Sequence, residues 1–258
     1  MSASKNLSIP VPWGSVKGLE WGSPSKPHIL AVHGWLDNCN SFYFLGPALA
    51  DVGYHVIAID LPGHGLSDHL PPGLHYHDLE FVSIIHRLIT KLEWKESGFS
   101  FVGHSLGAGI CLLYTVAFPE QVKHLIMLDM TYLPARPGTP LEFSARLKAA
   151  VEGGIKLEER LKNPPKIYNS KDEALEKLLK PPVYMKDRKV QQTLTEQSGR
   201  ILLERGLKKV EGGFCFSRDL RMAISLLNLP SWEDQIQLSQ EVSCLMIDID
   251  IREAAFIG

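Results

Sequence analysis

The stretch Phe-Ser-Phe-Val-Gly-His-Ser-Leu-Gly occupies positions 99–107 and leads into a second apolar run that ends before Pro119. Its last five residues match the pattern G-x-S-x-G, in which a serine stands on a tight turn between a strand and a helix. The two glycines of the pattern, Gly103 and Gly107, allow that turn. Because the pattern also occurs by chance, its position between a strand-like and a helix-like run is what gives it weight. We therefore expect Ser105 to be a nucleophile.

Strand-like and helix-like patterns alternate on both sides of this turn. Short runs rich in β-branched or aromatic residues predict buried strands at 29–32, 55–60, 99–102 and 122–128. Helical patterns separate them at 41–51, 78–93 and 106–118, and the stretch 9–21 reads as a hairpin. Such alternation predicts an α/β fold with a doubly wound, mostly parallel sheet and helices on both faces.

Composition limits the classes of partner. The chain has 258 residues, 45% of them hydrophobic, and a formal net charge of −2, which disfavours nucleic acid or an anionic membrane as the main partner. Four scattered cysteines predict reduced, mostly buried thiols. The first residues lack a signal-like apolar segment and no run reaches the length of a membrane span, so we expect an intracellular, cytoplasmic protein without an integral membrane segment.

The second half of the chain differs in character. Prolines at 134, 137 and 140 mark a linker, and charged helix-like segments then continue to about Arg221 without a strand-like stretch. We interpret residues 134–226 as a helical cap inserted between two parts of the core, 1–133 and 227–258. The apolar run at 242–247 predicts one more core strand.

Acyl transfer by a serine requires stabilisation of the oxyanion that forms after attack. The backbone N–H of Leu106, at the expected helix start, is one candidate donor. The second is the N–H of Trp35, in the His-Gly-Trp sequence that directly follows the strand at 29–32. A further stretch, Asp-Leu-Pro-Gly-His-Gly-Leu-Ser-Asp at 60–68, predicts a rigid loop near the site, in which His64 has a structural role.

The motifs at 33–35, 60–65 and 103–107, in this order and spacing, resemble those of α/β-hydrolases of the serine hydrolase-like protein family. The resemblance covers roughly residues 9–247. It implies an eight-stranded sheet, a helical cap after the sixth strand, and acyl transfer through an acyl-serine with water as second substrate. It implies no metal and no organic cofactor. Related enzymes with aspartate at the turn, epoxide hydrolases and haloalkane dehalogenases, are disfavoured because Ser105 occupies that position.

One part of the family pattern is not matched. All ten histidines lie at or before His124, whereas the triad order in this fold is serine, acid, histidine. From Asp248 only eleven residues remain, so the last strand and closing helix are expected to be missing. Candidate acids are Asp129, after the sixth strand, and Asp248 or Asp250. Candidate substitute bases are His33 and His104, while His86 and His124 read as ordinary structural residues.

Two classes of function follow. The first is a serine hydrolase acting on an ester-like or related acyl bond of a small molecule, with Ser105 as nucleophile and Asp129 as candidate acid. The second is a catalytically silent binding or interaction protein, or an unstable shortened variant of a complete hydrolase. Removing the base of a triad costs several orders of magnitude in rate, so the absence of a later histidine keeps the second class open.

Overall fold

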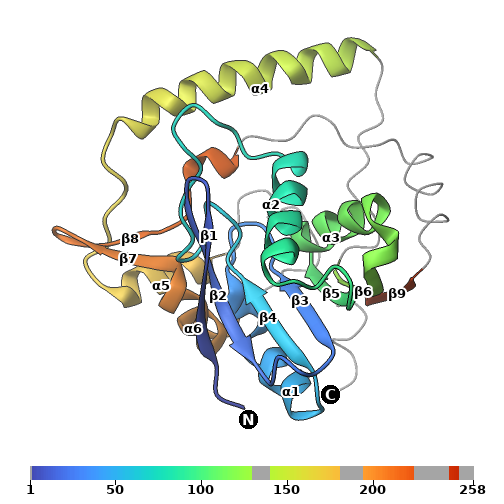
Figure 1. Cartoon of the computed structure of the whole chain (residues 1–258). Coiled ribbons are helices and arrows are strands. Elements are labelled where there is room, and N and C mark those ends of the chain that lie inside the picture. The colour runs from blue at the N-terminus through green and yellow to red at the C-terminus, as the bar shows by residue number, and fades with distance from the viewer. Residues whose placement is uncertain (1, 130–139, 181–193, 224–243, 250–258) are drawn as a thin grey trace.

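Within the part of the chain that the structure describes, a seven-stranded sheet forms the centre. The computed structural model describes residues 2–129, 140–180, 194–223 and 244–249. The strand order is β1-β2-β4-β3-β5-β6-β9; β2 is antiparallel to both of its neighbours, β1 and β4, and all other neighbouring strands pair in parallel (Figure 1). The bounds are β1 Lys5–Val11, β2 Gly14–Trp21, β3 His28–Val32, β4 His55–Ile59, β5 Phe99–His104, β6 Val122–Leu128 and β9 Leu245–Ile249. The predicted α/β fold with a mostly parallel sheet is confirmed.

Helices cover both faces of this sheet. Two of them, α2 (Asp78–Lys91) and α3 (Leu106–Ala117), bury their apolar side chains on one face, whereas η1 (Cys39–Phe42) and α1 (Leu45–Asp51) pack on the other. The single helix predicted at 41–51 is wrong in one respect. Asn38 accepts a hydrogen bond from the backbone of Asn40 and begins a short 3-10 turn, which is separate from α1.

The region after β6 is not purely helical. It contains α4 (Pro140–Leu161), α5 (Lys171–Leu179), α6 (Glu196–Gly206) and the 3-10 turn η4 (Leu220–Ala223). It also contains an antiparallel hairpin of β7 (Leu207–Val210) and β8 (Gly213–Phe216), so the expectation of no strand-like stretch up to about Arg221 is wrong. Gly212 and Gly213 adopt φ values of 83° and 147°, which allow the tight turn, and each strand is only four residues long. Periodicity is hard to read over so few residues.

After β6, the chain returns to the central sheet with one more strand. The strand predicted at 242–247 is present as β9, displaced toward the C-terminus, and pairs in parallel with β6. The linker prolines 134 and 137 and the candidate acid Asp250 lie outside the described residues.

All four cysteines are free, three of them buried and Cys244 half-buried, as predicted. Within the described ranges, no helix has the length and hydrophobicity needed to cross a membrane.

Candidate active site

Ser105 stands on a strained turn between β5 and α3. Its φ of 48° and ψ of −117° lie in a region that residues with a Cβ rarely occupy. A Cβ on Gly103 would lie 2.5 Å from the Cα of Ala108, and one on Gly107 would lie 2.1 Å from the carbonyl oxygen of Val32. The turn can therefore form only because both positions are glycine.

The hydroxyl of Ser105 is not used to cap the helix that follows. Ser105 is the N-cap residue of α3, yet its side chain makes no capping hydrogen bond. Its backbone N–H instead donates to the carbonyl of Leu128 at 2.9 Å, which ties the turn to the end of β6. Leu106 is the first residue of the helix, where backbone N–H groups have no partner within the helix. Such groups favour negative charge nearby.

The loop after β3 lies against this turn. A Cβ on Gly34 would be 2.7 Å from His104 Nδ1 and 3.4 Å from the Cβ of Ser105. Trp35, the predicted oxyanion donor, is the next residue along this loop. The indole N–H of Trp35 donates to the carbonyl of Met222 at 2.9 Å, which connects this loop to η4.

Asp129 directly follows β6, at the same edge of the sheet as the serine turn. In the β5–β6 register His104 pairs with Leu128, so Asp129 continues the strand opposite Ser105. Its φ is 55°, and its backbone N–H donates to the carbonyl of Ile249 at 3.0 Å. The parallel pairing thus gathers the candidate nucleophile and the candidate acid at one edge.

Two histidines, His33 and His104, were candidates for a substitute base. The prediction is wrong for His33. Its ring is fully buried and both nitrogens are engaged, one with the backbone of Leu61 and one with that of Gly34. Burial lowers its pKa, which the nearby carboxylate of Asp60 only partly offsets. His33 therefore has no nitrogen to offer Ser105.

His104 is placed differently. Its side chain is half-buried, and its Nδ1 lies 3.9 Å from Oδ2 of Asp37. Burial raises the pKa of Asp37, and the neighbouring histidines His33 and His104 act in the opposite direction. Sequence reasoning missed Asp37 because it follows the His-Gly-Trp motif as an ordinary loop residue; only folding brings it to His104.

The two histidines predicted to be structural lie away from the serine turn. His124 is near the start of β6 and its Nδ1 is 3.0 Å from the hydroxyl of Ser100. His86, on α2, contacts the hydroxyl of Tyr114 and stacks on Phe118. These contacts agree with structural roles.

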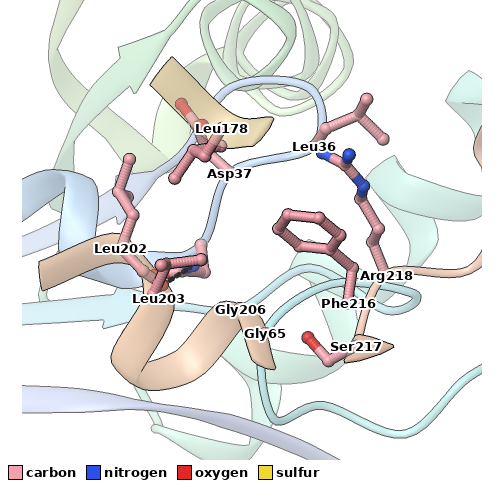
Figure 2. Close-up of a pocket in the computed structure, with 11 residues that line it drawn as sticks. Leu36, Asp37, Gly65, Leu178, Leu202, Leu203, Gly206, Phe216, Ser217 and Arg218 are labelled. Atoms are coloured by element: carbon pink, nitrogen blue, oxygen red, sulfur yellow. Dashed lines mark hydrogen bonds between the residues drawn. The ribbon is translucent and has the colours of Figure 1, made fainter. Parts of the chain in front are cut away.

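A pocket adjoins the loop after β3 (Figure 2). It encloses about 320 Å³ of empty space, part of it open to solvent. Asp37 lies on one side, and on another Arg218 extends over the ring of Phe216, with the guanidinium 4.5 Å from the ring centroid. The helices α5 and α6 supply an apolar wall with Leu178, Leu202 and Leu203. The pocket therefore combines an apolar wall with charges of both signs, and Oδ2 of its residue Asp37 lies 3.9 Å from Nδ1 of His104.

No cluster that suits a metal ion is present among these described residues. Three or more His, Cys, Asp or Glu side chains do not converge on one point anywhere in the described ranges.

The fold and the serine turn define an α/β-hydrolase, and residues 27–153 match the family model described as alpha/beta hydrolase fold. A "Probable serine hydrolase" of Drosophila melanogaster is 34% identical over 256 residues, which are 95% of this chain and 71% of that protein. "Serine hydrolase-like protein 2" of Homo sapiens is 36% identical over 217 residues, which are 84% of this chain and 65% of that protein. The chain belongs to the serine hydrolase-like protein family.

Solved structures share the fold over nearly the whole chain. A hypothetical protein from Pseudomonas aeruginosa PAO1 superposes with a TM-score of 0.81 at 25% identity, covering 95% of this chain and 80% of that one. A thioesterase domain from the curacin biosynthetic pathway gives a TM-score of 0.77 at 25% identity, covering 96% of this chain and 83% of that domain.

Proposed function

We propose that this chain is a serine hydrolase that cleaves an ester-like acyl bond of a small molecule through an acyl-serine intermediate. The observation that carries the proposal is the backbone of Ser105, held at a φ of 48° by a turn that admits no side chain at Gly103 or Gly107. The names of its relatives, serine hydrolases, and of one structural neighbour, a thioesterase domain, support acyl transfer.

In the proposed reaction the Oγ of Ser105 attacks the carbonyl carbon of the substrate while a base takes its proton. The negative charge on the carbonyl oxygen is stabilised by the N–H groups of Leu106 and Trp35. Collapse of the tetrahedral intermediate releases the alcohol, which takes up the proton. Water then attacks the acyl-serine in the same way, releases the acid and restores the hydroxyl.

Among the described histidines, His104 is the candidate base, with Asp37 as the carboxylate that orients its ring. Its position next to the serine and its half-buried ring support this role. Asp129 is the other candidate acid, at the edge of the sheet that carries Ser105. A base must reach the hydroxyl directly or through one water, and contacts in an unliganded site often tighten when substrate binds.

One observation favours the second candidate function, a binding protein without turnover. Among the described residues, no imidazole nitrogen forms a hydrogen bond with the hydroxyl of Ser105. A protein of this kind would keep the pocket of Figure 2 and bind small molecules there without cleaving them.

The test is acylation of the purified chain by p-nitrophenyl acetate, followed by intact mass and release of p-nitrophenol. We expect a mass increase of one acetyl group that Ser105→Ala abolishes, and a slower reaction in His104→Gln. Binding of small esters with neither acylation nor release, unchanged in Ser105→Ala, would instead support the binding protein.

A further inference from the structure

Two loops with the same dipeptide lie side by side next to the serine turn. One follows β3 and carries His33-Gly34; the other follows β4 and carries His64-Gly65. The strands are neighbours in the sheet, with Val32 paired to Ile59, so both loops emerge at the same edge. Both imidazoles are completely buried and meet edge to face, with ring centroids 4.9 Å apart.

Each histidine bonds to the backbone of the other loop. The Nε2 of His33 accepts a hydrogen bond from the N–H of Leu61 at 3.0 Å, and the Nε2 of His64 accepts one from the N–H of Leu36 at 3.2 Å. Because an N–H can only donate, both Nε2 atoms must be unprotonated. The neutral rings therefore carry their proton on Nδ1.

The two Nδ1–H groups hold the histidines to their own loops. That of His33 donates to the carbonyl of Gly34 at 2.7 Å, and that of His64 to the carbonyl of Pro62 at 3.2 Å. All four ring nitrogens are thus satisfied by backbone groups, and the two loops are joined reciprocally.

The bond to Leu36 acts on a strained residue. The N–H of Asp37 donates to the carbonyl of Gly34 at 3.2 Å and closes a turn, within which Leu36 has a φ of 65°. A residue with a side chain is strained in this region and persists there only where its surroundings impose it. The hydrogen bond from the N–H of Leu36 to the Nε2 of His64 helps to impose this conformation. Leu36 directly follows Trp35.

We propose that His33 and His64 are positioning residues: as a reciprocal pair they fix the turn that carries Trp35 and so aim its N–H at the serine turn. We call the reciprocal hydrogen bonds of His33 and His64 the brace. The brace forms independently of any catalytic activity, whereas its catalytic consequence rests on the proposed function, in which Trp35 is an oxyanion donor.

The brace requires both rings to stay neutral, and their surroundings favour this. Burial lowers the pKa of His64 to about 3, with further lowering from His33 and Arg218. His33 faces the carboxylates of Asp60 and Asp37 and the imidazole of His104, and burial still lowers its pKa.

The first test does not depend on hydrolase activity. Nitrogen-15 NMR of the histidine rings in the full chain is expected to show two imidazoles with the proton on Nδ1 and no titration from pH 5 to 8. His64→Leu should remove one of them and speed amide hydrogen exchange at Leu36 at least tenfold. Both rings titrating in this range, or unchanged exchange in the variant, would overturn the brace.

The second test measures its catalytic consequence, as the rate at which a fluorophosphonate probe labels Ser105. Removing an oxyanion donor costs about 10²–10³ in rate, so we expect labelling about tenfold or more slower in His64→Leu. His64→Gln offers an amide oxygen in place of Nε2 and should recover much of the rate. His75→Leu, at an exposed histidine, is the matched control and should label as the parent does.

The results separate two failures. If the parent chain is not labelled but the NMR and exchange results hold, the brace stands and the proposed hydrolase function fails. If the parent is labelled and a folded His64→Leu, with an intact thermal transition, is labelled equally fast, the positioning role is wrong.

Discussion

At the scale of single residues, the turn at Ser105 requires neighbouring residues that have no side chain. Gly107 faces the carbonyl oxygens of Val32 and His33, at 2.1 and 2.6 Å from the position of a Cβ. These are backbone atoms of β3 and of the loop after it, and they cannot move aside as a flexible side chain would. The unusual backbone of Ser105 is therefore imposed by close packing of α3 against β3.

We expect Gly107→Ala to destabilise the fold by more than about 2 kcal/mol and to abolish acylation of Ser105, since α3 must move away from β3 to accept the methyl group. Gly153→Ala is the matched control. That position lies within α4, nothing comes within 4 Å of the added Cβ, and the better helix propensity should add about 0.5–1 kcal/mol. Urea unfolding of both variants checks this, and equal effects would contradict it.

The need for glycine at these positions could be predicted from the sequence because it is local. G-x-S-x-G and His-Gly-Trp state which positions cannot carry a side chain, and the structure brings these two motifs together. The pairing of Asp37 with His104 was not predictable, because it joins two loops that are distant along the chain. Nothing in a single sequence states which loops will meet.

At the scale of elements, a buried ion pair joins α6 to the end of β4. The guanidinium of Arg205 donates two hydrogen bonds to Oδ2 of Asp60, at 2.7 and 3.0 Å, and both side chains are almost fully buried. Asp60 also accepts from the backbone N–H groups of Cys39 and Leu66. One carboxylate thus organises the loop after β4, the turn η1 and the helix of the second half.

Removing one partner of a buried pair leaves an uncompensated charge, so we expect Arg205→Leu to cost about 3–5 kcal/mol in the free energy of unfolding. Arg200→Leu serves as the control on the same helix. Its exposed pairs with Glu196 and Asp172 should contribute little, and the melting temperature should hardly change. Similar losses of stability in both variants, measured by urea and thermal unfolding, would show that the buried pair has no special role.

Element prediction succeeded where periodicity had enough length. The strands of the first half and the helices α2 and α3 are close to their predicted bounds, because each buries a continuous apolar pattern. The β7–β8 hairpin was missed because it packs Phe214 and Phe216 against Tyr168 within a charged region, in strands too short to show a pattern. Its Glu-Gly-Gly turn at 211–213 was the one available signal.

At the scale of the whole molecule, buried neutral histidines make stability depend on pH. The pKa of His64 is about 3 in the folded chain, against about 6.5 for an unfolded histidine. Between these values the unfolded chain binds a proton that the folded chain does not. The contribution of the neutral His64 to the free energy of unfolding is therefore fully present above about pH 6.5, and it is lost as the pH decreases toward 3.

We expect the free energy of unfolding to fall by about 1.4 kcal/mol per pH unit for this one histidine between pH 6 and 4. His64→Gln should reduce the measured slope by about that amount, whatever its effect on stability at pH 7. Exposed His75→Gln should leave the slope unchanged. Urea titrations at several pH values measure it, and equal slopes in the parent and His64→Gln would contradict a neutral buried His64.

The most direct test of the central claim is to treat the natively folded chain with a fluorophosphonate and locate the adduct by peptide mass spectrometry. The account predicts one adduct, on Ser105, that is absent from Ser105→Ala and from heat-unfolded protein. A folded chain with no adduct, or with the same adduct level in Ser105→Ala, would contradict the claim that this turn holds an activated serine.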